Sequence, residues 1–338
     1  MALPPVNPER ISDLVERLLD RGYREAASAV IGAVARSTNT GLIARRLDEL
    51  EAEARRLSEA GERLAPDNPV LRSLRADLAD VLRRDAQALN EAAPQVQQTG
   101  VEAAGTLTRQ LALPGFTDRD LALARIVWNT PDAEAVNRLV QYASSEAWAR
   151  ELRRFTTSAL DVVNGAAIRG FVEGWGPLRI VREVRRLAED FPPFQANNLM
   201  RTLQLQSYRA ATAAHQQANA GILEYQIRIA ARDERTCLCC IALHGTRLPV
   251  GEPIQDHHQG RCTSIAVVRG FPRTVQTGEV WFNGLPREQR LIIAGPGVLE
   301  ALERGEVRLA DFVQPYSDPV FGDMVREGSL RRALGLAA

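Results

Sequence analysis

The chain has 338 residues, a length typical of two or three domains. With 45% hydrophobic and 25% charged residues it has an ordinary globular composition and enough apolar side chains for a sizeable core. Its 42 basic and 42 acidic residues give a formal net charge of zero. This balance argues against a strongly basic nucleic-acid-binding protein and against an acidic tail.

The basic side chains are all arginine, because the sequence contains no lysine. A Schiff-base lysine and the lysine of a phosphate-binding P-loop are therefore excluded, and with them the kinases and P-loop ATPases. The N-terminal segment lacks the apolar core of a secretory signal, and no stretch approaches the ~18 apolar residues of a membrane helix. We expect a protein made in the reducing cytoplasm, where clustered cysteines are more often metal ligands or redox groups than disulfides.

The first part of the chain, residues 1–115, is expected to be helical. Apolar side chains between residues 41 and 57 recur at alternating spacings of four and three, at Ile43, Leu47, Leu50, Ala54 and Leu57. This pattern predicts one stripe along a helix. A second helix is expected to begin at the cap Asn68 and Pro69 and to carry the stripe Leu71, Leu74, Leu78 and Val81. Two such helices predict an antiparallel hairpin, within a bundle or as an interaction arm.

Residues 116–222 are expected to form a second helical region. Thr117 is a suitable cap with Asp120 three residues later, and Thr130 with Pro131 predicts the start of another helix. Further helices are expected over residues 144–174, after Gly176, and from Ala196 to about Asn219.

The pattern changes in residues 223–338, which are expected to form a small α+β domain. Apolar and polar side chains alternate from Glu224 to Ile229, which predicts a half-buried strand. A second strand is expected within residues 261–271, and short helices within 286–293 and 295–306. The predicted fold class is therefore mainly α with a C-terminal α+β domain that a metal ion stabilises.

All four cysteines and three of the four histidines lie between residues 237 and 262. A Cys-x-x-Cys pair lets two thiolates bind one zinc ion from a single turn, and a second pair must come from another turn. The stretch "DHHQGRC" can supply it. The spacing predicts a structural, tetrahedral zinc site, with either His257 or His258 as the nitrogen ligand. The predicted ligands are Cys237, Cys240, His257 and Cys262.

The other groups in this region have simpler interpretations. Cys239 is expected to be a small buried residue, and His244 a hydrogen-bonded histidine beside the turn at Gly245. His215 is expected on the surface of its helix.

Two catalytic alternatives stay open. One is a thioredoxin-like redox pair, although the βαβ unit that such a pair opens is missing. The other is a metal-dependent nuclease of the HNH kind, which would use Asp256 and His257 with Asn283.

The cysteine region resembles the phage head-morphogenesis family, the Mu F-like minor head proteins. That family's pattern is Asp-x-Arg-Thr-Cys-x-x-Cys, then Leu-His/Asp-Gly, then a histidine shortly before Cys-Arg-Cys. The matching residues here are Asp233, Arg235, Thr236, Cys237, Cys240, Leu243, His244, Gly245, His257, Arg261 and Cys262. A downstream tryptophan, a Pro-x-x-Gln helix and a Gly-Pro-Gly turn extend the resemblance over about residues 130–310.

The sequence departs from this family at two positions. Leu203 stands where the family's upstream Arg-Thr-Glu helix has its glutamate, after the matching Arg201 and Thr202. Gly260 replaces the first cysteine of Cys-Arg-Cys. The second departure leaves one ligand set, formed by the cysteines at 237, 240 and 262 with a histidine.

The resemblance implies a non-enzymatic virion protein, present in few copies inside the phage head near the portal. It implies a role in head assembly, DNA packaging or ejection, with the portal and major capsid proteins as partners and an oligomeric context in the virion. Packaged DNA is a further partner through arginine–phosphate contacts. Because the family's α+β part has been likened to ADP-ribosyltransferase folds, a toxin of that kind is a second enzymatic alternative.

Overall fold

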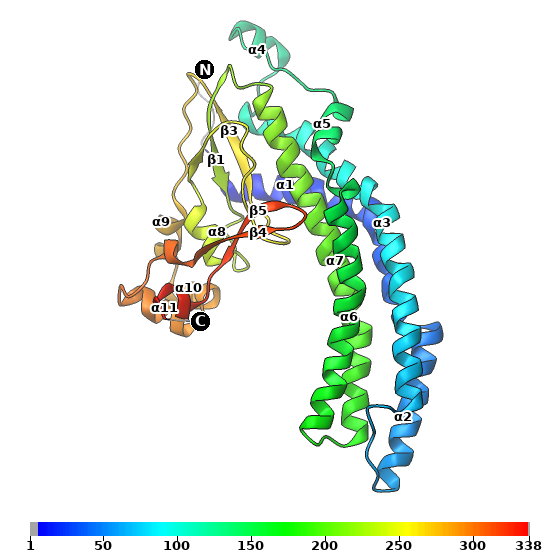
Figure 1. Ribbon diagram of the computed structural model, residues 1–338. Coiled ribbons are helices and arrows are strands. Elements are labelled where there is room, and N and C mark those ends of the chain that lie inside the picture. The colour runs from blue at the N-terminus through cyan, green and yellow to red at the C-terminus, as the bar shows by residue number, and fades with distance from the viewer. Residues whose placement is uncertain (1–5, 337–338) are drawn as a thin grey trace. The chain divides into compact units, whose positions relative to one another are not determined.

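The computed structural model describes residues 6–336, and its secondary structure is mostly helical (Figure 1). The chain divides into two compact units. The helical unit comprises residues 23–96 and 143–203, and the sheet unit comprises, among the described residues, 6–22, 97–142 and 204–336. The predicted fold class, mainly α with a C-terminal α+β part, is confirmed. Among residues 6–336, no helix is both long enough and apolar enough to cross a membrane.

Seven α-helices precede the first strand. Their bounds are α1 Pro8–Asn39, α2 Gly41–Glu59, α3 Pro69–Ala112, α4 Asp118–Leu123, α5 Ala133–Val140, α6 Glu146–Val172 and α7 Pro177–Gln217, with a 3-10 turn η1 at Tyr142–Ser144. The helices α1, α3 and α7 each supply residues to both units.

The predicted hairpin of α2 and α3 is present in the helical unit. All nine side chains of the two apolar stripes are buried. Asn68 caps α3 by accepting hydrogen bonds from the amides of Val70 and Leu71, at 2.9 and 3.3 Å. The antiparallel pairing brings Arg46 Nε within 2.6 Å of Asp77 Oδ2.

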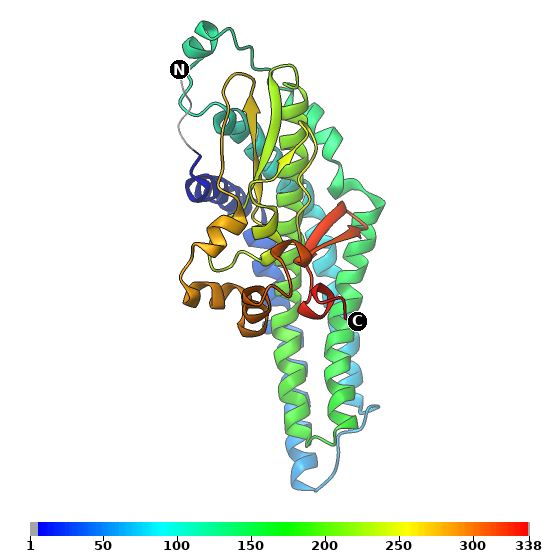
Figure 2. The same cartoon turned by 90° about the vertical axis from the view of Figure 1, so that its left-hand side faces the viewer.

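The α2–α3 hairpin forms a bundle with α6 and α7. Figure 1 and Figure 2 both show these four helices side by side. Arg185 of α7 donates a hydrogen bond to Asp48 of α2 at 2.7 Å, and Thr156 of α6 donates one to the Leu82 carbonyl of α3 at 3.4 Å. Of the two interpretations of the hairpin, the bundle therefore describes the helical unit.

Two helix boundaries differ from the sequence expectation. The helix expected from Thr130 begins at Ala133, because Asp132 is the cap and accepts a hydrogen bond from the Ala135 amide at 3.0 Å. The helix expected from Ala196 is part of α7, which continues through Pro192 and Pro193. Tertiary contacts on this stretch, such as Gln195 Nε2 with Ser158 Oγ at 2.5 Å, outweigh the helix-breaking tendency of proline.

A buried carboxyl group in the helical unit makes its stability depend on pH. Asp85 is 7% exposed and accepts a hydrogen bond from Ser37 at 2.6 Å. Burial raises the pKa of Asp85 to about 6. The pKa of Asp85 is therefore higher in the folded protein than in the unfolded chain. Its protonated carboxyl group contributes fully to the stability of the fold at pH below about 4, and this contribution is lost as the pH rises through 6.

We therefore expect Asp85→Asn to stabilise the protein at pH 8 by about 1–2 kcal/mol, with a much smaller gain at pH 4.5. Urea unfolding at the two pH values measures the difference. The exposed Asp67→Asn is the matched control and should change stability by less than about 0.5 kcal/mol at both. An Asp85→Asn gain that is equal at pH 4.5 and pH 8 contradicts the prediction.

The sheet unit contains a three-stranded antiparallel sheet of order β2–β1–β3 and a separate hairpin of β4 and β5. The elements after α7 are β1 Leu223–Ile229, α8 Leu238–Leu243, β2 Arg247–Leu248, β3 Thr263–Val268, α9 Gly278–Asn283, α10 Arg287–Ala294, α11 Pro296–Glu303, η2 Leu309–Phe312, β4 Val313–Asp318, β5 Gly322–Glu327 and α12 Leu330–Ala333. The two strands and two short helices expected from the sequence are present. The hairpin was not expected.

The main core of the sheet unit lies between the sheet and helices. Ile227 and Ile265, which are partners in register, pack with Val15 of α1, Leu107 of α3 and Tyr208 of α7. The prediction of a half-buried β1 is wrong for its C-terminal half. There the polar side chains Gln226 and Arg228 are 1% and 2% exposed, since the connection between β2 and β3 covers them.

Candidate metal centre

The first cysteine pair lies on a turn that its own polar residues hold in shape. Asp233 Oδ1 accepts hydrogen bonds from the Arg235 amide at 3.1 Å and from the Thr236 hydroxyl at 2.9 Å. The Thr236 hydroxyl oxygen accepts one from the Asp233 amide at 3.0 Å. Cys237 follows as the N-cap of α8, and its sulfur accepts the Cys240 amide at 3.4 Å. The turn therefore places the two thiols on one side.

Arg261 joins this turn to the second half of the motif. Its Nη1 and Nη2 donate to the two carboxylate oxygens of Asp233, each at 2.6 Å. The hydrogen bonds from Arg261 hold the pKa of Asp233 well below its usual range. Because Arg261 precedes Cys262, this bidentate pair fixes Cys262 relative to Cys237 and Cys240.

The four predicted ligands are divided between two neighbouring groups of candidate ligands that share Cys240. His257 Nε2 is 3.4 Å from Cys237 Sγ and 3.4 Å from Cys240 Sγ. Ligand atoms of Cys240, Asp256 and Cys262 also lie within 4.8 Å of one another, so Cys240 belongs to both groups. In a tetrahedral zinc site the edge between a nitrogen and a sulfur ligand is about 3.5 Å, given the usual bond lengths. The cluster is therefore able to hold a metal ion.

The two adjacent histidines have different surroundings. His257 Nδ1 lies 2.8 Å from the carbonyl oxygen of His258, which can hold the proton on Nδ1 and leave Nε2 free toward the thiols. His258 Nε2 instead lies 3.1 Å from Asp318 Oδ2 on β4. The geometry therefore brings His257, and not His258, to the cysteines.

A buried network of ion pairs lies next to the cysteine and histidine side chains. Asp256 is 0% exposed, and its carboxylate is 2.7 Å from Arg209 Nη2 and 3.2 Å from Arg228 Nη2. It also accepts hydrogen bonds from the amides of His257 and Cys262, at 3.0 and 3.2 Å. Burial alone would raise the pKa of Asp256, but the charges of Arg209 and Arg228 outweigh it and hold the pKa at about 2.

Sequence reasoning missed these two arginines. Arg228 was assigned to the solvent face of its strand, and Arg209 lies in an alanine-rich stretch of α7 without a motif. The only available signal was Arg228 itself, an arginine between two isoleucines in a strand that precedes the cysteines. Arg209 also donates to the carbonyls of Gly260 and Cys262, so it holds the backbone of the second ligand turn.

The network has the charge that a metal–thiolate centre needs. A divalent zinc ion with three thiolates and a neutral histidine carries one net negative charge, and Asp256 adds a second. Arg209 and Arg228 supply two positive charges, and Arg228 Nη2 lies 3.7 Å from Cys240 Sγ. Without a metal, hydrogen bonds among the thiols and burial raise the pKa values of the Cys240 and Cys262 thiols well above the ordinary value for cysteine.

The network also accounts for the glycine at position 260. A Cβ atom added there would lie 2.3 Å from Asp256 Oδ2 and 2.4 Å from its Cγ. A cysteine at this position cannot coexist with the buried carboxylate as it lies here. The departure from Cys-Arg-Cys is therefore tied to Asp256.

The remaining cysteine and histidines are structural. Cys239 is 0% exposed, as expected, and packs away from the ligand groups. His244 is buried, and its Nδ1 accepts the Ala230 amide at 2.9 Å. Burial lowers the pKa of His244 to about 4. The expectation that His215 lies on the surface is wrong, because it is 3% exposed and packs beside Gly105 of α3.

The residues named in the catalytic alternatives have different surroundings. Asn283 is exposed at the end of α9. The Asp256 carboxylate is occupied by two arginines. Of the Cys-x-x-Cys pair, Cys240 is buried and Cys237 is partly exposed. No protein-family model, no curated protein and no solved structure matches the chain.

Proposed function

We propose that the protein is a structural minor head protein of a tailed phage or a phage-like particle, and that its C-terminal part is held together by one zinc ion. The observation that carries the proposal is the connection among the motif residues. Asp233, Thr236 and Arg261 share the pattern of the head-morphogenesis family, and their hydrogen bonds place the two cysteine turns against each other.

The proposed ligands are Cys237, Cys240, His257 and Cys262. Four protein ligands fill a tetrahedral zinc ion and leave no position for a substrate, so the metal would have a structural role. It would join the start of α8 to the turn before β3, two segments that otherwise meet through polar contacts such as the Asp233–Arg261 pair. Such a clamp suits a region of short elements with small separate cores.

The proposed partners are the portal and major capsid proteins, with packaged DNA as a lesser partner through arginines. The helical unit offers apolar side chains that no element of the unit covers. Val172 of α6 is 81% exposed, and Phe194 of α7 is 63% exposed. Exposed apolar groups on helices are typical of surfaces that bind a partner.

The surroundings of Asp256 and His257, the two candidate catalytic groups, favour a structural role over a nuclease. A general base must face its substrate, yet Asp256 is fully buried and the Nε2 atom of His257 faces two sulfur atoms. The same geometry suits a closed metal site.

The location of the protein in particles tests the proposal. Particles from the strain that carries the gene are purified on a density gradient and analysed by quantitative mass spectrometry. We expect the protein to co-purify with the heads in far fewer copies than the major capsid protein, and to remain after washing with high salt. A host cytoplasmic protein of similar abundance is the control and should be absent.

A protein that stays free in the cytoplasm and is missing from purified heads would contradict the proposal. If that free protein also cut DNA with added Mg²⁺, and His257→Ala abolished the cleavage, the nuclease alternative would replace it.

A further inference from the structure

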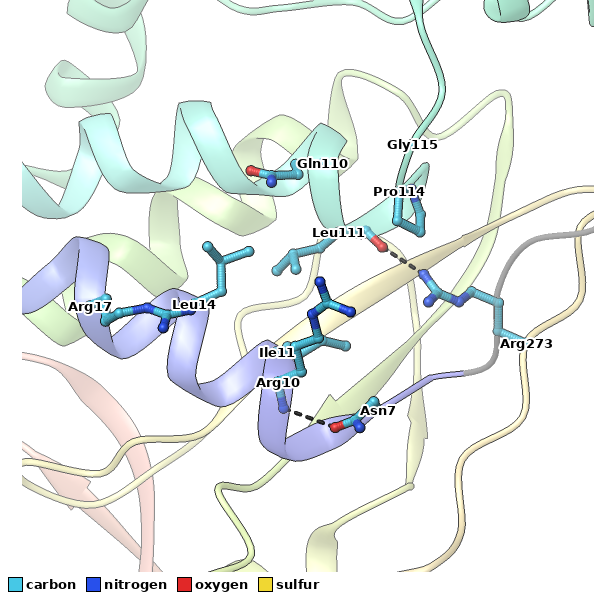
Figure 3. Close-up of a pocket in the computed structure, with 10 residues that line it drawn as sticks. All are labelled: Asn7, Arg10, Ile11, Leu14, Arg17, Gln110, Leu111, Pro114, Gly115 and Arg273. Carbon is cyan, nitrogen blue, oxygen red and sulfur yellow. Dashed lines mark hydrogen bonds between the residues drawn. The ribbon is translucent and has the colours of Figure 1, made fainter.

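A pocket in the sheet unit, away from the cysteine cluster, combines an apolar lining with arginines (Figure 3). It has a volume of about 470 Å³, which lies in the range of small-molecule sites. The first two turns of α1, the end of α3 and the segment after β3 contribute to it. Its apolar lining includes Ile11, Leu14, Leu111 and Pro114.

All the charged side chains that line the pocket are positive. They are Arg10 and Arg17 of α1 and Arg273 from the segment after β3. Within residues 6–336, no carboxylate forms a salt bridge with any of these three arginines. By contrast, most of the arginines in α2 and α7 that form a salt bridge have their partner one turn away. Among the described residues, these three guanidinium groups around one cavity therefore have no carboxylate within salt-bridge distance.

Arg273 is the most constrained of the three. It is 6% exposed, and its Nη1 donates to the carbonyl oxygen of Leu111 at 2.6 Å, near the C-terminus of α3. This contact explains how the side chain is held but uses only one of its donors. Its buried Nε has no hydrogen-bond partner among the described residues, and burial lowers the pKa of the group. A guanidinium can bind a carboxylate through two parallel hydrogen bonds, from Nη1 and Nη2 or from Nε and Nη2.

We propose that this pocket binds an amphipathic carboxylate, with the negative group between Arg10 and Arg273 and the apolar chain against Leu14 and Leu111. In Figure 3 the guanidinium groups of Arg10 and Arg273 extend toward the same side of Leu111. The ligand supplies a negative charge beside the arginines, and the apolar wall selects an anion that carries a hydrocarbon group over a bare inorganic ion. This site is independent of the proposed zinc and of a role in the phage head.

Isothermal titration of the full chain with octanoate tests the proposal. We expect a dissociation constant of about 1 mM or tighter and one site per chain. Two further probes separate the contributions of the ligand's parts, because 1-octanol lacks the charge and acetate lacks the chain. Both should bind at least about tenfold more weakly than octanoate.

Matched variants locate the site. Arg10→Ala should weaken octanoate binding by about threefold to tenfold, and Arg273→Lys, which keeps the charge but removes the fork, by about tenfold or more. Arg24→Ala removes an exposed arginine farther along α1 and should leave the affinity unchanged. Circular dichroism checks that each variant is folded, and Arg10 is exposed, so its replacement should not disturb the fold.

The carboxylate has two sources, a free acid or the C-terminal residue of a peptide. N-acetyl-leucyl-leucine and its C-terminal amide distinguish them. Tighter binding of the free-carboxylate peptide than of octanoate assigns the pocket to a chain terminus, and the reverse assigns it to a free acid. The proposal is overturned if neither anion binds below about 10 mM, or if Arg10→Ala and Arg24→Ala have equal effects.

Discussion

Asp256→Asn is expected to destabilise the protein by about 3–5 kcal/mol, because it removes a buried charge and leaves two buried arginines. The substitution keeps the size and shape of the side chain, so the effect isolates the charge. Arg209 and Arg228 are 3% and 2% exposed and cannot turn to solvent without opening the sheet unit. Urea unfolding at pH 7, followed by circular dichroism, measures the loss.

The exposed Asp323→Asn on β5 is the matched control for this measurement. It removes the same charge from the surface and should change stability by less than about 0.5 kcal/mol. If the two variants unfold at the same urea concentration, the two arginines do not depend on the Asp256 carboxylate for their burial.

Cys237→Ser is expected to abolish metal binding and to lower the unfolding temperature by roughly 10 °C or more. Inductively coupled plasma mass spectrometry should find about one zinc ion per chain in the unmodified protein and none in the variant. The large effect follows because a structural zinc ion contributes its binding free energy to folding. Cys237 is the least buried of the four cysteines, so its replacement by serine adds little cost of its own.

Cys239→Ser provides the comparison, since it changes a fully buried cysteine two positions away that lies outside both ligand groups. It should retain the metal and lose only the modest stability expected of a polar substitution in the core. An unmodified protein that contains no metal, or a Cys239→Ser variant that loses it, would refute the assignment of ligands.

Local signals in the sequence predicted many of the helices before the first strand well. The stripes that contain Leu47 and Leu74 have helical spacing, and Asn68 occupies a cap position, so neighbouring residues alone determine the outcome. The same holds for Thr117 and Asp120, which form a reciprocal capping box at α4. Where distant residues decide, prediction failed, as at Pro192 and Pro193, where tertiary contacts hold α7 together.

The sequence predicted that the cysteines and a histidine lie close together, but not the groups that surround them. The spacing of cysteines and histidines in the sequence indicates which of their side chains can lie close together, because the chain between them is short. Arg209 and Arg228 approach Asp256 from α7 and β1, and no local pattern connects positions 209, 228 and 256. The polar character of Arg228 also led to the wrong burial pattern for β1, since a buried arginine with hydrogen-bond partners is indistinguishable in sequence from an exposed one.

The order of the strands has a consequence for the rate of folding. β1 and β3 are neighbours in the sheet, yet Ile229 pairs with Thr263 across the whole cysteine region. A metal bound to Cys237 and Cys262 would join a point after β1 to a point just before β3. The loop that must close before the two strands can pair would then be much shorter. The entropic contribution to the free-energy cost of closing the loop then falls by roughly 1 kcal/mol. If β1 and β3 meet in the rate-limiting step, this corresponds to several-fold faster pairing of the two strands. Metal supply during synthesis would thus influence how quickly this sheet forms, and for how long its apolar strands stay exposed to aggregation.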